Sequence, residues 1–215
     1  MRYRALTIAI LAAFTLSTVP GSSAALEFTE VELLSLEQGD TLKKPLSKSR
    51  QKGFYGGSGW AIIDAPAEAI WKELQDWKYY PEIFPKTVSV RELSRKGTRS
   101  LLEVKMGHKL LSFIYHLDLV RDPEKMKISF RLMRDRAHDI DDTRGYWRLF
   151  PQKDGRTLVA YVVAAQVPMG VINLIGDVME EKIERHLLGM PGNLKVWIES
   201  AHTNSYHKMM AAAKK

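Results

Sequence analysis

Cysteine is absent from the 215 residues of this chain. Disulfide bonds, thiol catalysis and cysteine-based zinc sites are therefore excluded, and so is a bacterial lipoprotein anchor, which requires a lipidated cysteine. The chain also has no GxSxG, P-loop or dinucleotide-binding motif. We therefore expect neither a serine hydrolase nor a nucleotide-dependent enzyme.

Metal-ligand patterns are also missing. An acidic loop at residues 135–142 does not follow the DxDxDG order of a calcium-binding loop. The six histidines show no HExxH or HxH spacing and no paired carboxylate ligand; they are His108, His116, His138, His186, His202 and His207. The sequence predicts no metal site and no cofactor.

No apolar run reaches the length of about 20 residues that a membrane span needs. The longest run, residues 5–19, follows Arg2 and Arg4 and is ended by Pro20 and Gly21. Small residues follow at positions 22–25, as at a signal-peptidase site. We expect residues 1–25 to be a secretory signal, cleaved after Ala24 or Ala25, and the mature protein to be soluble and periplasmic.

The formal net charge is +7, and Arg2 and Arg4 supply two of these charges. The rest of the excess is scattered over the two ends of the chain, with no basic helix and no aromatic–basic RNA-binding pattern. Nucleic acid is therefore not an expected partner. The basic residues fit two alternatives, solvated flanks or transient contact with anionic lipid at a membrane surface.

Apolar and polar residues alternate along much of the chain, as in strands with one buried face. The clearest case is residues 110–120, where Phe113, Tyr115 and Leu117 share a face. Short turns separate these segments, which predicts an antiparallel meander of about seven strands at residues 54–63, 87–93, 100–106, 110–120, 126–132, 143–151 and 157–166.

Helical spacing occurs in three places. Residues 30–36 fit a short helix, followed by a polar and basic arm to residue 52, and residues 66–77 fit an amphipathic helix that begins with Pro66. Pro81 and Pro85 then favour a turn or a second short helix. A long helix is expected from residue 171 to 188, interrupted at residues 189–192 and resumed to residue 201.

One motif joins these elements: a strand, then APxxxhW in a helix, then D[WF]xxYPxhhP before the next strand, where h is apolar. It is carried by Ala65, Pro66, Trp71, Asp76, Trp77, Tyr80, Pro81, Ile83, Phe84 and Pro85. The motif resembles the polyketide cyclase/dehydrase and coenzyme-Q-binding branch of the START-like superfamily. This resemblance implies an α+β helix-grip fold, a curved antiparallel sheet wrapped around a long C-terminal helix. The expected divisions are an N-terminal arm at residues 26–53, the START-like domain at 54–202 and a tail at 203–215.

The resemblance also implies an apolar cavity between the sheet and the C-terminal helix. The expected lining is Trp77, Tyr80, Phe84, Met106, Phe113, Tyr115, Leu117, Phe130, Trp147, Ile175 and Met179. A filled core would contain the same residue types, so residue type alone leaves both alternatives open.

Two functions follow from this expectation. The first is an exported binding or transfer protein for an apolar small molecule or lipid, such as a quinone or an isoprenoid. The alternative is a cyclase/aromatase-like enzyme acting on a polyketide, with Tyr115, His116, Arg131 and Arg144 as nominal candidates. Strand alternation places His116 and Arg131 on the outward face, so no catalytic residue is assigned. A third class, a protein-interaction module, fits an exported chain poorly, and the sequence names no protein partner.

Overall fold

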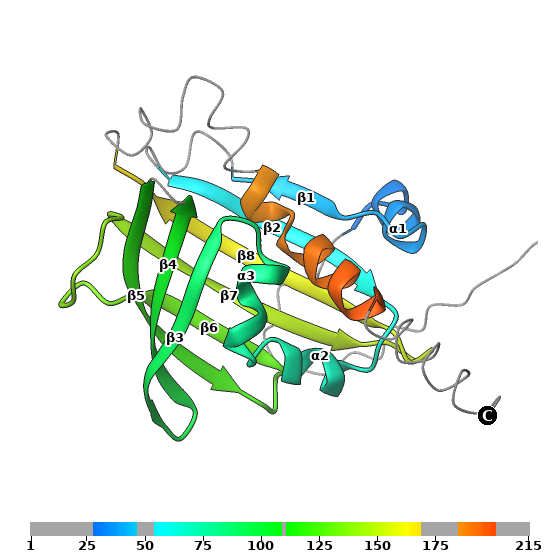
Figure 1. Cartoon of the computed structure of the whole chain (residues 1–215). Coiled ribbons are helices and arrows are strands. Elements are labelled where there is room, and N and C mark those ends of the chain that lie inside the picture. The colour runs from blue at the N-terminus through cyan, green and yellow to red at the C-terminus, as the bar shows by residue number, and fades with distance from the viewer. Residues whose placement is uncertain (1–27, 47–53, 109–110, 169–184, 201–215) are drawn as a thin grey trace, which may run out of the picture.

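A computed structural model describes residues 28–46, 54–108, 111–168 and 185–200 (Figure 1). The predicted signal segment and two predicted lining residues, Ile175 and Met179, lie outside these ranges. The strands form one antiparallel sheet of eight strands in the order β1-β2-β8-β7-β6-β5-β4-β3. Their bounds are β1 Leu42–Pro45, β2 Phe54–Ile63, β3 Thr87–Lys96, β4 Arg99–His108, β5 Leu111–Asp122, β6 Lys127–Leu132, β7 Asp142–Pro151 and β8 Thr157–Gln166.

The seven strands predicted from alternation are β2 to β8, and β1 is an addition. It lies within the predicted N-terminal arm and pairs with β2, from Leu42 opposite Trp60 to Pro45 opposite Gly57. The sheet therefore begins within the segment that was expected to be an arm. β1 and β3 form the two edges of the sheet.

The inner face of the sheet carries the main core. Paired residues of neighbouring strands share a face, and Trp147 pairs with both Ile128 and Tyr161. All three side chains are buried in one cluster, which also contains Leu194 and Ile198 from the C-terminal helical segment. The observed α+β architecture is the predicted helix-grip fold, a curved sheet with the C-terminal helix across its inner face (Figure 1).

The C-terminal helical segment covers residues 185–188 and 190–200, with a turn at Gly189. The predicted interruption is therefore present, but the helix resumes at residue 190 and not at 193. Gly59 of β2 permits the close approach of this segment, because a Cβ there would lie 2.2 Å from the carbonyl oxygen of Leu188. Within the described ranges, no helix is both long and apolar enough to cross a membrane.

The motif helix and the aromatic segment that follows it, residues 77–84 (called the elbow below), form three short elements. These are α2 (Ala67–Glu73), the 3-10 helix η1 (Trp77–Tyr79) and α3 (Tyr80–Ile83). The Tyr80 hydroxyl donates a hydrogen bond of 2.8 Å to the Leu74 carbonyl, so the elbow is tied back to the end of α2. Proline near the start of α3 is favourable because those N–H groups have no partner within the helix. Of the two predicted alternatives, a turn or a second short helix, the structure has the short helix.

A second, smaller core lies on the outer face of the sheet. It consists of Leu36, Trp60, Ile62 and Ala160, with Leu36 supplied by helix α1 (Glu30–Glu37). A capping box starts α1: the Thr29 side chain accepts from the Glu32 N–H, and the Glu32 carboxylate accepts from the Thr29 N–H. α1 thus shields one end of the outer face from water.

Candidate functional site

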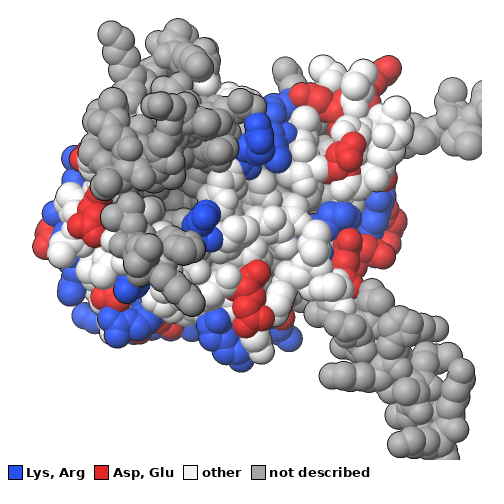
Figure 2. All heavy atoms as spheres, turned by 45° about the horizontal axis from the view of Figure 1, so that its top comes forward, with Lys and Arg blue, Asp and Glu red and all other residues white. Residues whose placement is uncertain are grey.

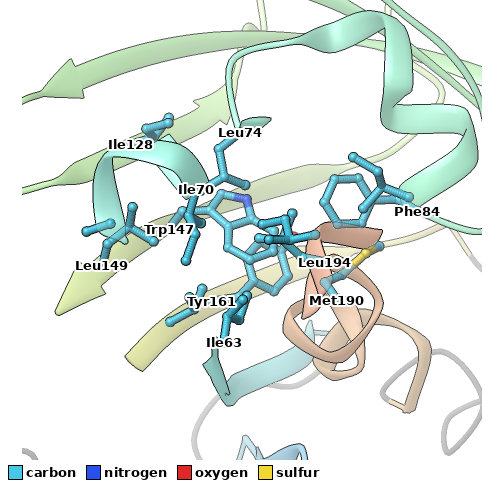
Figure 3. Close-up of a cluster of buried hydrophobic side chains, with 14 of the residues drawn as sticks. Ile63, Ile70, Leu74, Phe84, Ile128, Trp147, Leu149, Tyr161, Met190 and Leu194 are labelled. Atoms are coloured by element: carbon cyan, nitrogen blue, oxygen red, sulfur yellow. The ribbon is translucent and has the colours of Figure 1, made fainter. Parts of the chain in front are cut away.

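The expected lining residues divide into two groups on the inner face. Trp77, Phe84 and Trp147 are buried in the main core. The Trp147 ring lies 4.3 Å from the Tyr161 ring and 5.7 Å from the Phe84 ring, centroid to centroid, and Figure 3 shows it surrounded by other core side chains. At this end of the sheet, the space between strands and helix is filled by packing.

The second group lies toward the β4–β5 hairpin. Met106, Phe113 and Tyr115 are half-buried on the inner face, outside the main core cluster. The Phe113 and Tyr115 rings stack with centroids 6.3 Å apart, and the Tyr115 hydroxyl donates to the Met106 sulfur at 3.1 Å. Burial raises the pKa of the Tyr115 phenol, so this hydroxyl stays protonated. The group is an apolar surface with one polar atom.

Leu117 and Phe130 connect the two groups. Both side chains are partly buried and pack against the core cluster, and the Phe130 ring stacks on the Tyr161 ring at 6.0 Å. Tyr80 is also partly buried, with its ring 5.2 Å from Trp77 and 4.8 Å from Phe84. The aromatic side chains of the elbow therefore pack against one another and are continuous with the core.

Arg121 is a functional candidate that the sequence interpretation missed. Its side chain is only 3% exposed and lies on the inner face of β5, opposite Ile128 of β6. One Nη donates to the Ser100 hydroxyl at 2.7 Å, and the other lies 3.4 Å from the Glu92 carboxylate. The Nε atom is buried and has no hydrogen-bond partner among the described residues, so a buried donor is left unsatisfied there.

The electrostatic surroundings of Arg121 are mixed. Burial lowers the pKa of its guanidinium, Arg95 lowers it further, and Glu92 raises it. Tyr80 lies near enough to interact, and burial raises the pKa of the Tyr80 phenol. The alternation of β5 offered a signal for Arg121, because this residue follows Phe113, Tyr115, Leu117 and Leu119 at the same two-residue spacing.

The four residues named above as catalytic candidates do not lie around one site. Tyr115 is on the inner face, whereas Arg131 and Arg144, a direct pair across β6 and β7, are on the outer face. His116 also belongs to the outer face but is buried, because the loop after β6 covers it and its Nδ1 donates to the Ala137 carbonyl at 2.9 Å. The predicted outward orientation of His116 and Arg131 is confirmed. The described ranges bring no three potential metal-ligating side chains together.

Residues 63–189 match the protein family described as polyketide cyclase/dehydrase and lipid transport. The chain belongs to this family. The matched segment begins at the end of β2 and extends to Gly189, so it contains the elbow and strands β3 to β8. The predicted resemblance to the START-like superfamily is confirmed.

Among curated proteins, the chain is similar to the granaticin polyketide synthase bifunctional cyclase/dehydratase of Streptomyces violaceoruber. The two are 28% identical over 150 residues, which is 65% of this chain and 43% of that protein. The chain thus spans less than half of the length of this relative.

Two solved structures share the fold. A protein from Thermus thermophilus superposes with a TM-score of 0.51 at 17% identity, covering 64% of this chain and 95% of that one. A STAR-related lipid transfer protein from Xanthomonas axonopodis superposes with a TM-score of 0.50 at 14% identity, covering 73% and 98%. At these identities the likeness concerns the fold alone.

Proposed function

We propose that this protein is an exported carrier that binds an apolar ligand, a lipid, quinone or isoprenoid, between the inner face of the sheet and the C-terminal helix. The observation that carries the proposal is the half-buried group of Met106, Phe113 and Tyr115, which lies outside the packed core. Burying an alkyl chain against such a surface is favourable by about 0.8 kcal/mol for each CH₂ group removed from water. A carrier needs no further chemistry than this.

The hydrogen-bonding chemistry of the half-buried group supports the same proposal. The face presented in Figure 2 has uncharged residues over much of its centre, with most Lys, Arg, Asp and Glu toward its margins. The one polar atom of the half-buried group, the Tyr115 hydroxyl, is paired with a thioether sulfur, which is a weak acceptor. A carbonyl or hydroxyl oxygen of a ligand is a stronger acceptor and would replace the sulfur at little cost. A quinone or prenol matches this combination of apolar contact and single hydrogen bond.

The binding test is native mass spectrometry, followed by organic extraction, of the protein purified from bacterial cells. A stoichiometric apolar adduct is expected in the wild type and is expected to disappear in Phe113→Glu, which places a charge on the inner face. Ile114→Glu is the matched control, because Ile114 is the next residue of β5 and is 36% exposed on the outer face. An empty wild-type protein that also takes up no quinone or phospholipid from liposomes would overturn the carrier proposal.

Export is tested separately. The basic residues Arg2 and Arg4, the apolar run and the small residues at 22–25 support a cleaved secretory signal. N-terminal sequencing of the protein from the periplasmic fraction is expected to start after Ala24 or Ala25. Unprocessed protein in the cytoplasmic fraction would reject export and leave the binding proposal intact.

Arg121 favours a second candidate, a cyclase-like enzyme. A buried guanidinium whose Nε–H is unsatisfied among the described residues is suited to polarise a substrate carbonyl, since hydrogen bonds from charged donors strengthen in a water-excluded site. The relative from Streptomyces violaceoruber is named as a cyclase/dehydratase. Incubation with a poly-β-ketone thioester is expected to give a cyclised product in the wild type and none in Arg121→Met. A wild type that returns the substrate unchanged would reject this candidate.

A further inference from the structure

A hollow lies on the outer face of the sheet, opposite the proposed apolar site. Its volume is about 590 Å³, and its charged lining consists of Arg99, Arg131, Arg134, Arg144, Asp135 and Asp142. The residues come from β4, β6, β7 and the loop that follows β6. Four arginines that are distant in the sequence are therefore gathered around one concave surface.

Two buried carboxylates position these arginines. Asp118 of β5, with a side chain only 5% exposed, accepts hydrogen bonds from the Arg99 Nε and Nη2 atoms, each at 2.5 Å, and from the Arg131 Nε atom at 2.9 Å. Asp142, 10% exposed, lies 3.1 Å from the Arg134 Nη2 atom and 3.4 Å from the Arg144 Nη1 atom. Each carboxylate thus holds two guanidinium groups at the hollow.

The guanidinium groups remain accessible. The side chains of Arg99, Arg131, Arg134 and Arg144 are between 51% and 71% exposed. The described contacts of Arg99 with Asp118 use two of its N–H groups, and a guanidinium has five. N–H donors of Arg99 therefore remain for a ligand after its ion pair with Asp118 has formed.

The hollow has more positive than negative groups. Four guanidinium groups face the carboxylates of Asp118, Asp142 and Asp135, which leaves one cationic charge in excess. A single carboxylate ligand needs only one arginine, whereas a phosphate monoester has three terminal oxygens that can accept from several arginines at once. Arginine is also the side chain best suited to planar, two-point recognition of phosphate oxygens.

We propose that this outer hollow is a binding site for a phosphate group, carried by a soluble phosphate or by a lipid headgroup. The site is independent of the proposed apolar site, because the two lie on opposite faces of the sheet. A lipid source would place the outer face against an anionic membrane. A soluble source would make the hollow a site for a free phosphorylated molecule.

Isothermal titration with inorganic phosphate and with pyrophosphate tests the shared chemistry, and sedimentation with vesicles tests the lipid source. The vesicles contain phosphatidylcholine alone or phosphatidylcholine with phosphatidic acid. Binding to the soluble anions is expected to weaken about tenfold or more in Arg131→Gln/Arg134→Gln. Loss of binding to phosphatidic acid vesicles in the same variant would assign the site to headgroups, and loss of soluble-anion binding alone would assign it to soluble phosphates.

The matched control is Arg91→Gln. Arg91 is exposed on the outer face, where it pairs with Glu103 of β4, and it does not line the hollow. This variant removes one positive charge outside the hollow, as Arg134→Gln removes one inside it, and it is expected to bind within about twofold of the wild type. Arg134→Gln alone, in an exposed loop, provides a variant whose folding depends little on the change. Equal weakening in Arg91→Gln and the hollow variants, or no binding by the wild type to any probe, would overturn the proposal.

Discussion

The guanidinium carbon of Arg121 lies 5.6 Å from the centroid of the Trp77 indole ring. This contact joins the elbow of the family motif to the inner face of β5, and both side chains are buried. A cation over an aromatic face gains about 0.5–2 kcal/mol, depending on how fully it is desolvated. The contact offsets part of the cost of burying a charge on a face that is otherwise apolar.

Arg121→Met tests whether that charge is retained for stability. A buried charge pair is often no more stabilising than an apolar side chain of similar volume, so the free energy of unfolding is expected to stay within about 1 kcal/mol of the wild type or to rise. Glu92→Ala is the contrasting variant and is expected to cost about 1–3 kcal/mol, because it leaves the guanidinium buried without its carboxylate. Urea unfolding measures both. A larger loss in Arg121→Met than in Glu92→Ala would show that Arg121 is structural.

Gly59→Ala tests the close approach of the C-terminal helix to β2. The added Cβ would lie 2.2 Å from the Leu188 carbonyl oxygen, a backbone atom, so strand and helix must separate. Overpacking of this kind costs about 2–3 kcal/mol, which calorimetry would detect as a lower Tm.

Gly97→Ala is the control for Gly59→Ala. A Cβ at Gly97 meets no atom of the described part of the chain within 4 Å, but its φ of +57° is left-handed, so only about 1 kcal/mol of backbone strain is expected. Equal losses in the two variants would show that the helix approach is not tight.

Most of the sheet could be predicted because one buried face imposes a two-residue period on each strand. The exception, β1, is only four residues long and contains Lys43, Lys44 and Pro45. Charged residues and proline are tolerated at a sheet edge, where one side of the backbone has no partner strand. A strand of this kind has the composition of a loop, and only its pairing with β2 identifies it.

The candidate site was less predictable, for two physical reasons. Trp147 and Phe113 have the same apolar character in the sequence, but the structure buries Trp147 in the core and leaves Phe113 half-buried. Which of them meets a ligand depends on how much of the inner face the helix covers, and this is a tertiary property. Arg121 was missed because a charged residue after an apolar run resembles the end of a strand, whereas here it continues the inner face.

Thr157→Val tests a buried hydrogen bond that ties β8 to Ala65, in the turn that precedes α2. The Thr157 hydroxyl is fully buried and donates to the Ala65 carbonyl at 2.8 Å. Valine keeps the shape of the side chain and removes the donor, so the free energy of unfolding is expected to fall by about 1–3 kcal/mol. Urea unfolding of the two proteins is the measurement. Unchanged stability would show that this bond is replaced by another or is not formed in solution.

Asp118→Asn tests the carboxylate that holds Arg99 and Arg131 on the outer face. Hydrogen bonds from Arg99 and then Arg131 lower the pKa of Asp118 below its ordinary value of 3.8, although burial opposes them. A carboxyl with a lowered folded-state pKa contributes stability above its unfolded pKa, and that contribution is lost as the pH falls through the folded pKa. The wild type should therefore lose stability below about pH 4 through this group, and Asp118→Asn should lack that part of the decline.

The two proteins would be compared by urea unfolding at pH 7, 5 and 3. Asp118→Asn is expected to cost about 1–2 kcal/mol at pH 7, a modest value because both arginines are more than half exposed and can be hydrated once released. The difference is expected to shrink at pH 3. Asp135→Asn, in the exposed loop, is the control and is expected to differ little from the wild type at any pH. A constant difference between Asp118→Asn and the wild type from pH 7 to pH 3 would show that the charge of Asp118 does not contribute, and that the hollow is held by hydrogen-bond geometry alone.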